Sequence, residues 1–175
     1  FCELEDIKDH VIVVDSISKR FSACGARIGS IISRNREFMA EAMKLCQGRL
    51  CTATLDQTGA AAMYEHVQPS YFKEVRDEYK KRRDAVVEEL NKIPGTKFHT
   101  PDGAFYMMVT LPVDDAEKLQ YFLLEEFEDN GDTVMYAPGS GFYADPAYVH
   151  NCDYLRRAIQ LLGKGIAAYN AKRGV

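Results

Sequence analysis

Residues 15–29, DSISKRFSACGARIG, bring three side chains of complementary chemistry close together in the sequence. Lys19 follows an apolar run and carries an amine that can attack an aldehyde and form an imine. The hydroxyl of Ser16 can donate a hydrogen bond to an oxyanion, and the guanidinium of Arg27 can bind a phosphate through two hydrogen bonds. A cofactor that is held as a Schiff base and carries a phosphate group requires this combination.

Two glycines flank the arginine, and they affect how the stretch is interpreted. Gly25 and Gly29 are expected to let the backbone bring the guanidinium of Arg27 close to a ligand. Lys19 on its own would be interpreted as a solvated surface residue, because lysines are seldom buried. The neighbouring hydroxyl, guanidinium and glycines instead favour a binding site for a phosphate-bearing cofactor.

The elements around this stretch have the pattern of an α/β domain. VIVV at 11–14 is a continuous β-branched run, typical of a parallel strand that is covered on both faces, and 28–32 is a second candidate strand. Ligands of open α/β sheets bind beyond the carboxyl ends of the strands, where the lysine falls. Two helices are predicted next, one after the N-cap Asn35 and one over 57–67 with Asp56 as its cap.

The second half of the chain is predicted to form a long helix and a smaller α/β unit. The long helix is expected to start at Ser70 and to stop at Pro94-Gly95. Strands are expected at 103–111, 133–137 and 147–149, and a helix from the capping box Asp114–Glu117 to about residue 127. Asp153 is expected to cap a final helix. The apolar stripe of this helix consists of Leu155, Ala158, Ile159, Leu162, Ile166 and Tyr169.

Composition narrows the possible classes of protein. The 175 residues are 46% hydrophobic and 27% charged with a formal net charge of −4, which speaks against a nucleic-acid or membrane-surface partner. The basic run KKRR at 80–83 is best explained as a solvated helix face. No apolar run is long enough for a bilayer, and no secretory signal is present. The five cysteines form no CxxC pair and the four histidines lack ligand spacing, so we expect reduced thiols, a cytoplasmic location and no metal site.

The stretch SISKRFSACGARIG resembles the lysine signature of the class I and II aminotransferases, the fold type I enzymes that use pyridoxal 5′-phosphate. The resemblance continues in the same order through the remaining chain. The long helix that connects the two domains of the family is similar to YFKEVRDEYKKRRDAVVEELNKIPG. The first strand of its small domain is similar to PDGAFYMMVTLP, and a later loop is similar to APGSGFY. Within this family, the chain resembles the aspartate-type aminotransferases of bacteria.

The resemblance implies a role for each residue of the signature. Lys19 would hold pyridoxal 5′-phosphate as a Schiff base and move a proton during catalysis, while Ser16 and Arg27 would bind the cofactor phosphate. The implied reaction is amino-group transfer between an amino acid and a 2-oxo acid, by a homodimeric enzyme.

The resemblance also implies which part of the enzyme is present. Residues 1–69 would be the carboxyl-terminal part of the cofactor-binding large domain, 70–94 the connecting helix and 95–175 the small α/β domain. The Gly-rich phosphate loop and the Asp that pairs with the pyridine nitrogen would lie upstream, so the isolated chain is expected to be inactive. The arginine that binds the substrate carboxylate has no clear counterpart, since Arg156 and Arg157 fall on the final helix.

Three other interpretations stay open. A pyridoxal-phosphate lyase of the same family shares the signature. A non-catalytic aminotransferase-like domain would keep the motif without the chemistry. A transcription regulator with such a domain would need a DNA-binding segment before residue 1.

Overall fold

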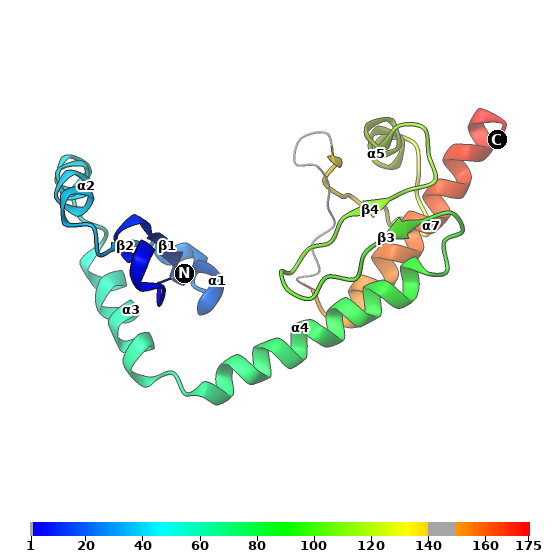
Figure 1. Cartoon of the computed structure of the whole chain (residues 1–175). Coiled ribbons are helices and arrows are strands. Elements are labelled where there is room, and N and C mark those ends of the chain that lie inside the picture. Colours follow the sequence, from blue (N-terminus) through cyan, green and yellow to red (C-terminus); the bar gives the residue numbers. More distant parts are fainter. Residues whose placement is uncertain (1, 140–149) are drawn as a thin grey trace. The chain divides into compact units, whose positions relative to one another are not determined.

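The computed structural model describes residues 2–139 and 150–175, and the chain divides into two compact units, Phe1–Pro69 and Ser70–Val175 (Figure 1). The first unit contains a short strand pair and several helices. Its elements are η1 (Glu5–His10), β1 (Ile12–Ser16), α1 (Ile17–Arg20), η2 (Cys24–Ala26), β2 (Gly29–Ser33), α2 (Arg36–Arg49) and α3 (Thr54–His66).

The strand pair corrects one expectation. β1 and β2 run antiparallel, with Val14 opposite Ile31 and Ser16 opposite Gly29, so the prediction of parallel strands is wrong for this pair. The segment between the strands explains the direction, because the chain turns back directly through α1 and η2 and the amide of Ile17 donates to the carbonyl of Ile28 (3.3 Å). A parallel pair would need a longer crossover. The mixed α/β class itself is confirmed.

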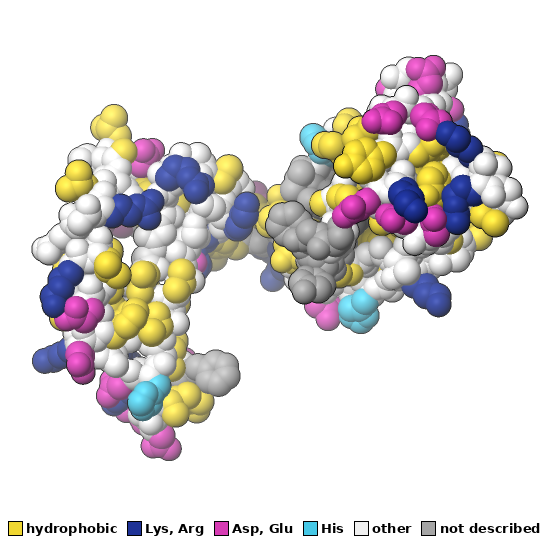
Figure 2. Space-filling model, turned by 90° about the horizontal axis from the view of Figure 1, so that it is seen from above, with side chains coloured by type: hydrophobic (Ala, Val, Ile, Leu, Met, Phe, Trp, Pro, Cys, Tyr) yellow, Lys and Arg dark blue, Asp and Glu magenta, His cyan; other side chains and the backbone are white. Residues whose placement is uncertain are grey.

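The strand pair leaves apolar side chains uncovered. Cross-strand partners point to the same face of a sheet, so Ile12, Val14 and Ile31 share one face, on which Val14 is 77% exposed. Figure 2 shows hydrophobic side chains at the surface of this unit, between scattered basic and acidic ones. Ile17 and Ala60 are its buried apolar residues among those described.

Of the two helix caps predicted in the first unit, one is confirmed and the other is wrong. Asn35 caps α2 as expected, since its side chain accepts from the amide of Phe38 (2.9 Å). Asp56 does not cap α3, because that helix starts at Thr54 and Asp56 lies in its first turn.

The second unit packs its helices around two apolar clusters. Val86 and Leu90 of one helix meet Leu155 and Ile159 of another, together with Met107. Its elements are α4 (Pro69–Leu90), β3 (Lys97–Phe98), β4 (Val109–Thr110), α5 (Ala116–Glu125) and α7 (Cys152–Arg173), and the second cluster consists of Leu119, Leu123, Leu162, Ile166 and Tyr169. The predicted stripe of the final helix is thus confirmed at all positions but Ala158, which is only partly buried.

Two predicted strands are shorter or missing in this unit. Only Val109–Thr110 of the stretch 103–111 forms a strand, after a left-handed residue at Ala104 (φ 63°). The stretch 133–137 forms no regular strand, and it is held to α5 instead: the amide of Tyr136 donates to Oε1 of Gln120 (2.9 Å), and the hydroxyl of Thr133 donates to the carbonyl of Leu123 (2.5 Å). The predicted strand at 147–149 lies outside the described residues.

The caps of α5 and α7 each differ from the expectation by one or two residues. Asp115, not Asp114, caps α5 and accepts from the amides of Glu117 and Lys118. Asn151, not Asp153, caps α7 and accepts from the amide of Tyr154 (2.9 Å). α4 starts at Pro69 rather than Ser70, which suits a residue without an amide hydrogen in the first helical turn.

α5 and α7 approach each other closely at a glycine. A Cβ added to Gly165, in the middle of α7, would lie 2.2 Å from Cδ2 of Leu123 on α5. No side chain larger than hydrogen fits at this position unless Leu123 moves.

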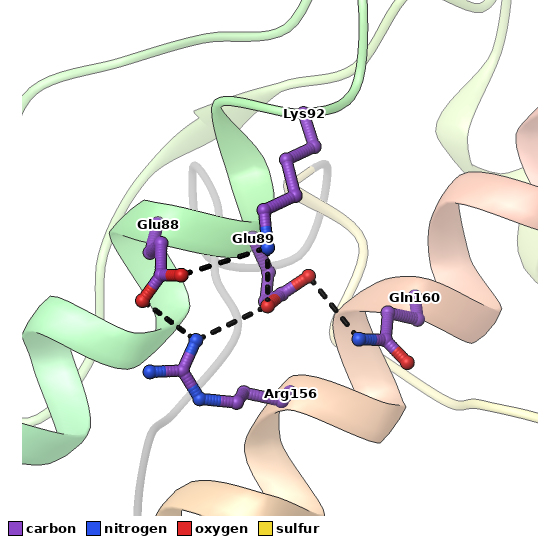
Figure 3. A network of polar contacts seen from close by, with 5 residues as sticks. All are labelled: Glu88, Glu89, Lys92, Arg156 and Gln160. Atoms are coloured by element: carbon purple, nitrogen blue, oxygen red, sulfur yellow. Dashed lines mark hydrogen bonds and ion pairs between the residues drawn. The ribbon is translucent and has the colours of Figure 1, made fainter.

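A polar network joins α4 to α7 (Figure 3). The carboxylate of Glu89 is only 4% exposed and accepts from Lys92 (2.8 Å), Arg156 (3.1 Å) and Gln160 (3.3 Å). Arg156 also donates to Glu88 (2.7 Å). The hydrogen bond from Lys92 lowers the pKa of Glu89 against the opposing effect of burial, and Gln160 and Arg156 lower it further.

Candidate active site

Ser16 stands where β1 ends and α1 begins, and its side chain is the N-cap of that helix. Its Oγ accepts from the amide of Ser18 (3.1 Å) and can donate to Oγ of Ser18 (2.9 Å) or to the carbonyl of Ile28 (3.2 Å). A serine in extended backbone before a helical turn favours this geometry, because its hydroxyl satisfies an otherwise unbonded amide. Ser16 is therefore fixed at the end of the strand pair.

Lys19 lies in the four-residue helix α1, which leaves the same end of the strand pair. The neighbouring Ile17 is 2% exposed and anchors this turn in the first unit, whereas the side chain of Lys19 is exposed. Two positions apart on this turn, one side chain is thus buried and the other exposed.

Arg27 ends the 3₁₀ turn η2 with its backbone in the left-handed region (φ 55°, ψ 40°). Its Nη1 donates to the carbonyl of Cys24 (2.9 Å), so the guanidinium folds over the turn that precedes it. Because Ser16 pairs with Gly29, only two residues beyond Arg27, the serine and the arginine lie at the same end of the strand pair.

The two glycines differ in what the structure requires of them. A Cβ on Gly29 would lie 3.1 Å from the carbonyl oxygen of Asp15, which is tighter than ordinary contact. A Cβ on Gly25 would meet nothing within 4 Å, and Gly25 is not among the residues with positive φ. The expectation that Gly25 supplies backbone freedom is therefore wrong, and Arg27 itself adopts the left-handed conformation.

Two residues, one directly before the signature and one within it, were not singled out from the sequence. The carboxylate of Asp15 accepts from the amide of Ser16 (2.8 Å) and from Nη2 of Arg20 (2.8 Å). The hydrogen bond from Ser16 and then the one from Arg20 lower the pKa of Asp15. Asp15 and Arg20 stand five positions apart in the sequence, with Lys19 between them. This spacing of opposite charges was the signal that could have revealed the ion pair.

The donor set fits a phosphate-bearing aldehyde. One end of the strand pair carries a hydroxyl that hydrogen-bonds to neighbouring acceptors, a guanidinium and an exposed primary amine. A hydroxyl and a guanidinium are suited to phosphate oxygens, and an amine to an aldehyde carbon. Ser16, Lys19 and Arg27 thus have the chemistry for pyridoxal 5′-phosphate.

The arginines of the final helix are bound to acids. Arg157 donates to Asp129 (2.7 Å) and Asp132 (3.0 Å), and Arg156 belongs to the network around Glu89. The part of APGSGFY from residue 140 onward lies outside the described residues.

The described residues, 2–139 and 150–175, offer neither a cluster of metal ligands nor a helix that could span a membrane. They contain no group of three or more His, Cys, Asp or Glu residues that could hold a metal ion. None of their helices is both long and apolar enough to cross a bilayer.

Comparison with known proteins identifies the family. A family model described as aminotransferase class I and II matches residues 2–142. The aspartate aminotransferase of Sulfurisphaera tokodaii is 37% identical over 146 residues, which cover 78% of this chain and 34% of that protein. The probable aspartate/prephenate aminotransferase of Aquifex aeolicus is 32% identical over 146 residues, with coverage of 80% and 36%.

Solved structures share the fold. The aspartate aminotransferase of Thermotoga maritima superposes with a TM-score of 0.72 at 28% identity, over 89% of this chain and 40% of that one. The kynurenine aminotransferase of Pyrococcus horikoshii superposes with a TM-score of 0.77 at 24% identity, over 93% and 42%. This chain therefore spans about a third to two fifths of the length of these relatives. It belongs to the class I and II aminotransferases and has the fold of the corresponding part of the fold type I enzymes.

Proposed function

We propose that this chain carries the lysine-bearing part of an aminotransferase that uses pyridoxal 5′-phosphate and transfers an amino group between an amino acid and a 2-oxo acid. One observation carries the proposal: Ser16, Lys19 and Arg27 belong to one end of the β1–β2 pair, within the residues that match the family model. Because the chain covers only part of its relatives, the activity is proposed for a protein that includes the remaining parts of the fold.

Each side chain has a separate task in this proposal. The amine of Lys19 holds the cofactor as a Schiff base and, once released by the substrate, moves a proton between substrate and cofactor. Ser16 and Arg27 bind the phosphate, which fixes the cofactor relative to the amine. The bound cofactor supplies the electron sink of the reaction.

Three further parts of this proposal rest on the family resemblance: the substrate class, the homodimeric assembly and the cytoplasmic location. The substrate class comes from the family alone, and aspartate is the substrate that several relatives carry in their names. Homodimeric assembly and a cytoplasmic location are also part of the proposal, and they rest on the resemblance. The lyase interpretation differs from it in the fate of the amino acid, so product analysis separates the two.

The proposal is tested by adding pyridoxal 5′-phosphate to the chain, reducing with borohydride and mapping the labelled peptides. We expect an absorbance band of the Schiff base and a label on Lys19 that exceeds the label on Lys44, an exposed lysine of α2. Lys19→Ala should lose the band and leave the label on Lys44 unchanged.

The same experiment separates a catalytic protein from a non-catalytic domain. Equal labelling of Lys19 and Lys44, in this chain and in a protein that contains the full family fold, would contradict the proposal. Preferential labelling of Lys19 only in the longer protein would show that further parts of the fold complete the site.

A further inference from the structure

The turn that carries Lys19 is too short to be stable by itself. α1 contains four residues, and a helix of this length cannot offset the cost of its own nucleation. The orientation of Lys19 therefore depends on contacts that this turn makes with its surroundings. Two of them are known from the site: the N-cap by Ser16 and the burial of Ile17.

A third contact spans the whole turn. The Asp15 carboxylate lies before α1 and binds the amide of Ser16 through Oδ1 (2.8 Å), while its Oδ2 binds Nη2 of Arg20 (2.8 Å), the last residue of α1. One carboxylate thus joins the first and the last residue of the segment that contains Lys19. We call these two residues the Asp15–Arg20 clamp.

The far side of the turn is attached to α3. The ring of Phe21, which follows α1, packs edge-on against the ring of Tyr64 at 5.1 Å between centroids. Asp15 and, more weakly, Tyr64 raise the pKa of Arg20. Arg20 and Phe21 therefore connect the lysine turn to Tyr64 of α3, which is more than 40 residues away in the sequence.

We propose that Asp15 and Arg20 are positioning residues for Lys19: their ion pair holds the α1 turn so that the amine faces the phosphate-binding side chains. This inference rests on the proposed function, because it concerns the orientation of the cofactor-binding lysine. The pair itself touches neither substrate nor cofactor in this proposal.

The test uses the 175-residue chain with pyridoxal 5′-phosphate and borohydride, and the readout is the initial rate of labelling of Lys19 divided by that of Lys44. Asp15→Asn keeps an acceptor for the Ser16 amide but removes the charge, and Arg20→Gln removes the partner. Each is expected to lower the ratio about threefold, as suits a partly exposed ion pair. The double variant should lower it no further than the single ones, and Arg20→Lys should restore most of it.

Glu5→Gln is the matched control. It removes an exposed ion pair with Lys8 on η1 of the same unit, outside the segment that contains Lys19, and is expected to leave the ratio unchanged. A loss of fold would change the labelling of all lysines, whereas lost positioning changes Lys19 alone. An unchanged ratio in Asp15→Asn and Arg20→Gln, or an equal loss in Glu5→Gln, would overturn the inference.

Hydrogen exchange supplies a readout that does not depend on the cofactor. The amide of Phe21 donates to the carbonyl of Ile17 (3.1 Å) and closes the α1 turn, so it should exchange about threefold faster in Asp15→Asn and in Arg20→Gln. If neither the wild-type chain nor a protein with the full family fold labels Lys19 preferentially, the proposed function fails, and the exchange rates still decide whether the clamp holds the turn. Unchanged exchange in both variants would contradict the clamp even if Lys19 is labelled.

Discussion

Arg27 combines an unusual backbone with a side chain suited to an anion. Its left-handed conformation is one that L-residues adopt at a cost of about 1 kcal/mol or more, and glycine would avoid this cost. A strained arginine at the end of the strand pair therefore indicates that the side chain, rather than the backbone, is what the position requires.

Arg27→Ala should weaken binding of pyridoxal 5′-phosphate about 10-fold, the size expected for hydrogen bonds to a charged group. Arg27→Gly should weaken binding by a similar factor. This variant also lacks the guanidinium, although glycine adopts the left-handed backbone conformation without strain. Titration of cofactor absorbance measures both. Arg34→Ala is the control, since Arg34 follows β2 at the opposite end of the strand pair; an equal loss there would argue for non-specific charge attraction.

Sequence analysis identified the reactive types of residue but not how they are held. Lys19, Ser16 and Arg27 stand out because an amine, a hydroxyl and a guanidinium near glycines match one ligand chemistry. The ion pair of Asp15 with Arg20 was signalled only by their spacing of five residues, because its geometry depends on the helical turn in which Ile17 is buried. The left-handed conformation of Arg27 was likewise hidden, since arginine has no intrinsic preference for it.

At the scale of elements, one buried carboxylate joins α4 to α7 in addition to their apolar contacts. Glu89→Ala should reduce the free energy of unfolding by about 1–3 kcal/mol, because it removes the acceptor for Lys92, Arg156 and Gln160. Chemical denaturation measures the change. Glu88→Ala is the matched control, because Glu88 shares Arg156 but is 55% exposed, so its loss should be clearly smaller. Equal losses would contradict a special role for the buried group.

The same carboxylate predicts a dependence on pH. Its pKa in the folded protein is lowered, chiefly by the hydrogen bond from Lys92, below the usual value of about 4.3. The folded state then binds fewer protons than the unfolded state, so this stabilisation is present above about pH 4.3 and is lost as the pH falls further. The difference in melting temperature between wild type and Glu89→Gln should shrink from pH 6 to pH 3. A constant difference would show that the charge of Glu89 does not contribute.

Helices and strands could be predicted where residues close in the sequence determine their type and their ends. The stripe of α7 follows from helical periodicity, and Asn35 is the one strong N-cap candidate before its helix. Asp114 and Asp115 are adjacent acids, and the sequence does not show which of them caps α5. In the tertiary structure Asp114 accepts from the hydroxyl of Tyr169 (2.9 Å), and Asp115 is the cap. Strand direction also depends on long-range pairing, so VIVV could not show that its partner runs antiparallel.

At the scale of the whole molecule, the first unit buries little of its apolar surface. Ile12, Val14 and Ile31 are 47%, 77% and 44% exposed on one face of a two-stranded sheet. A sheet of this size is marginally stable in water, and exposed apolar strands favour association between copies.

We expect the chain to associate with itself in proportion to its concentration, and Val14→Lys to reduce this association. Sedimentation velocity at two concentrations measures both. Leu55→Lys is the control, because Leu55 is more exposed (87%) but lies on α3 rather than on the sheet. A wild-type chain that is monomeric at both concentrations, or an equal effect of the two substitutions, would contradict the role of the sheet.

Gly165 has a consequence for the evolution of this unit. The space that a side chain would need there is already filled by Leu123, so the two positions share one volume between α5 and α7. Replacing Gly165 by a larger residue requires Leu123 to shift or to become smaller, because the two side chains would otherwise clash. The sizes of the residues at these two positions should therefore covary among relatives, as a large residue at one position and a small residue at the other.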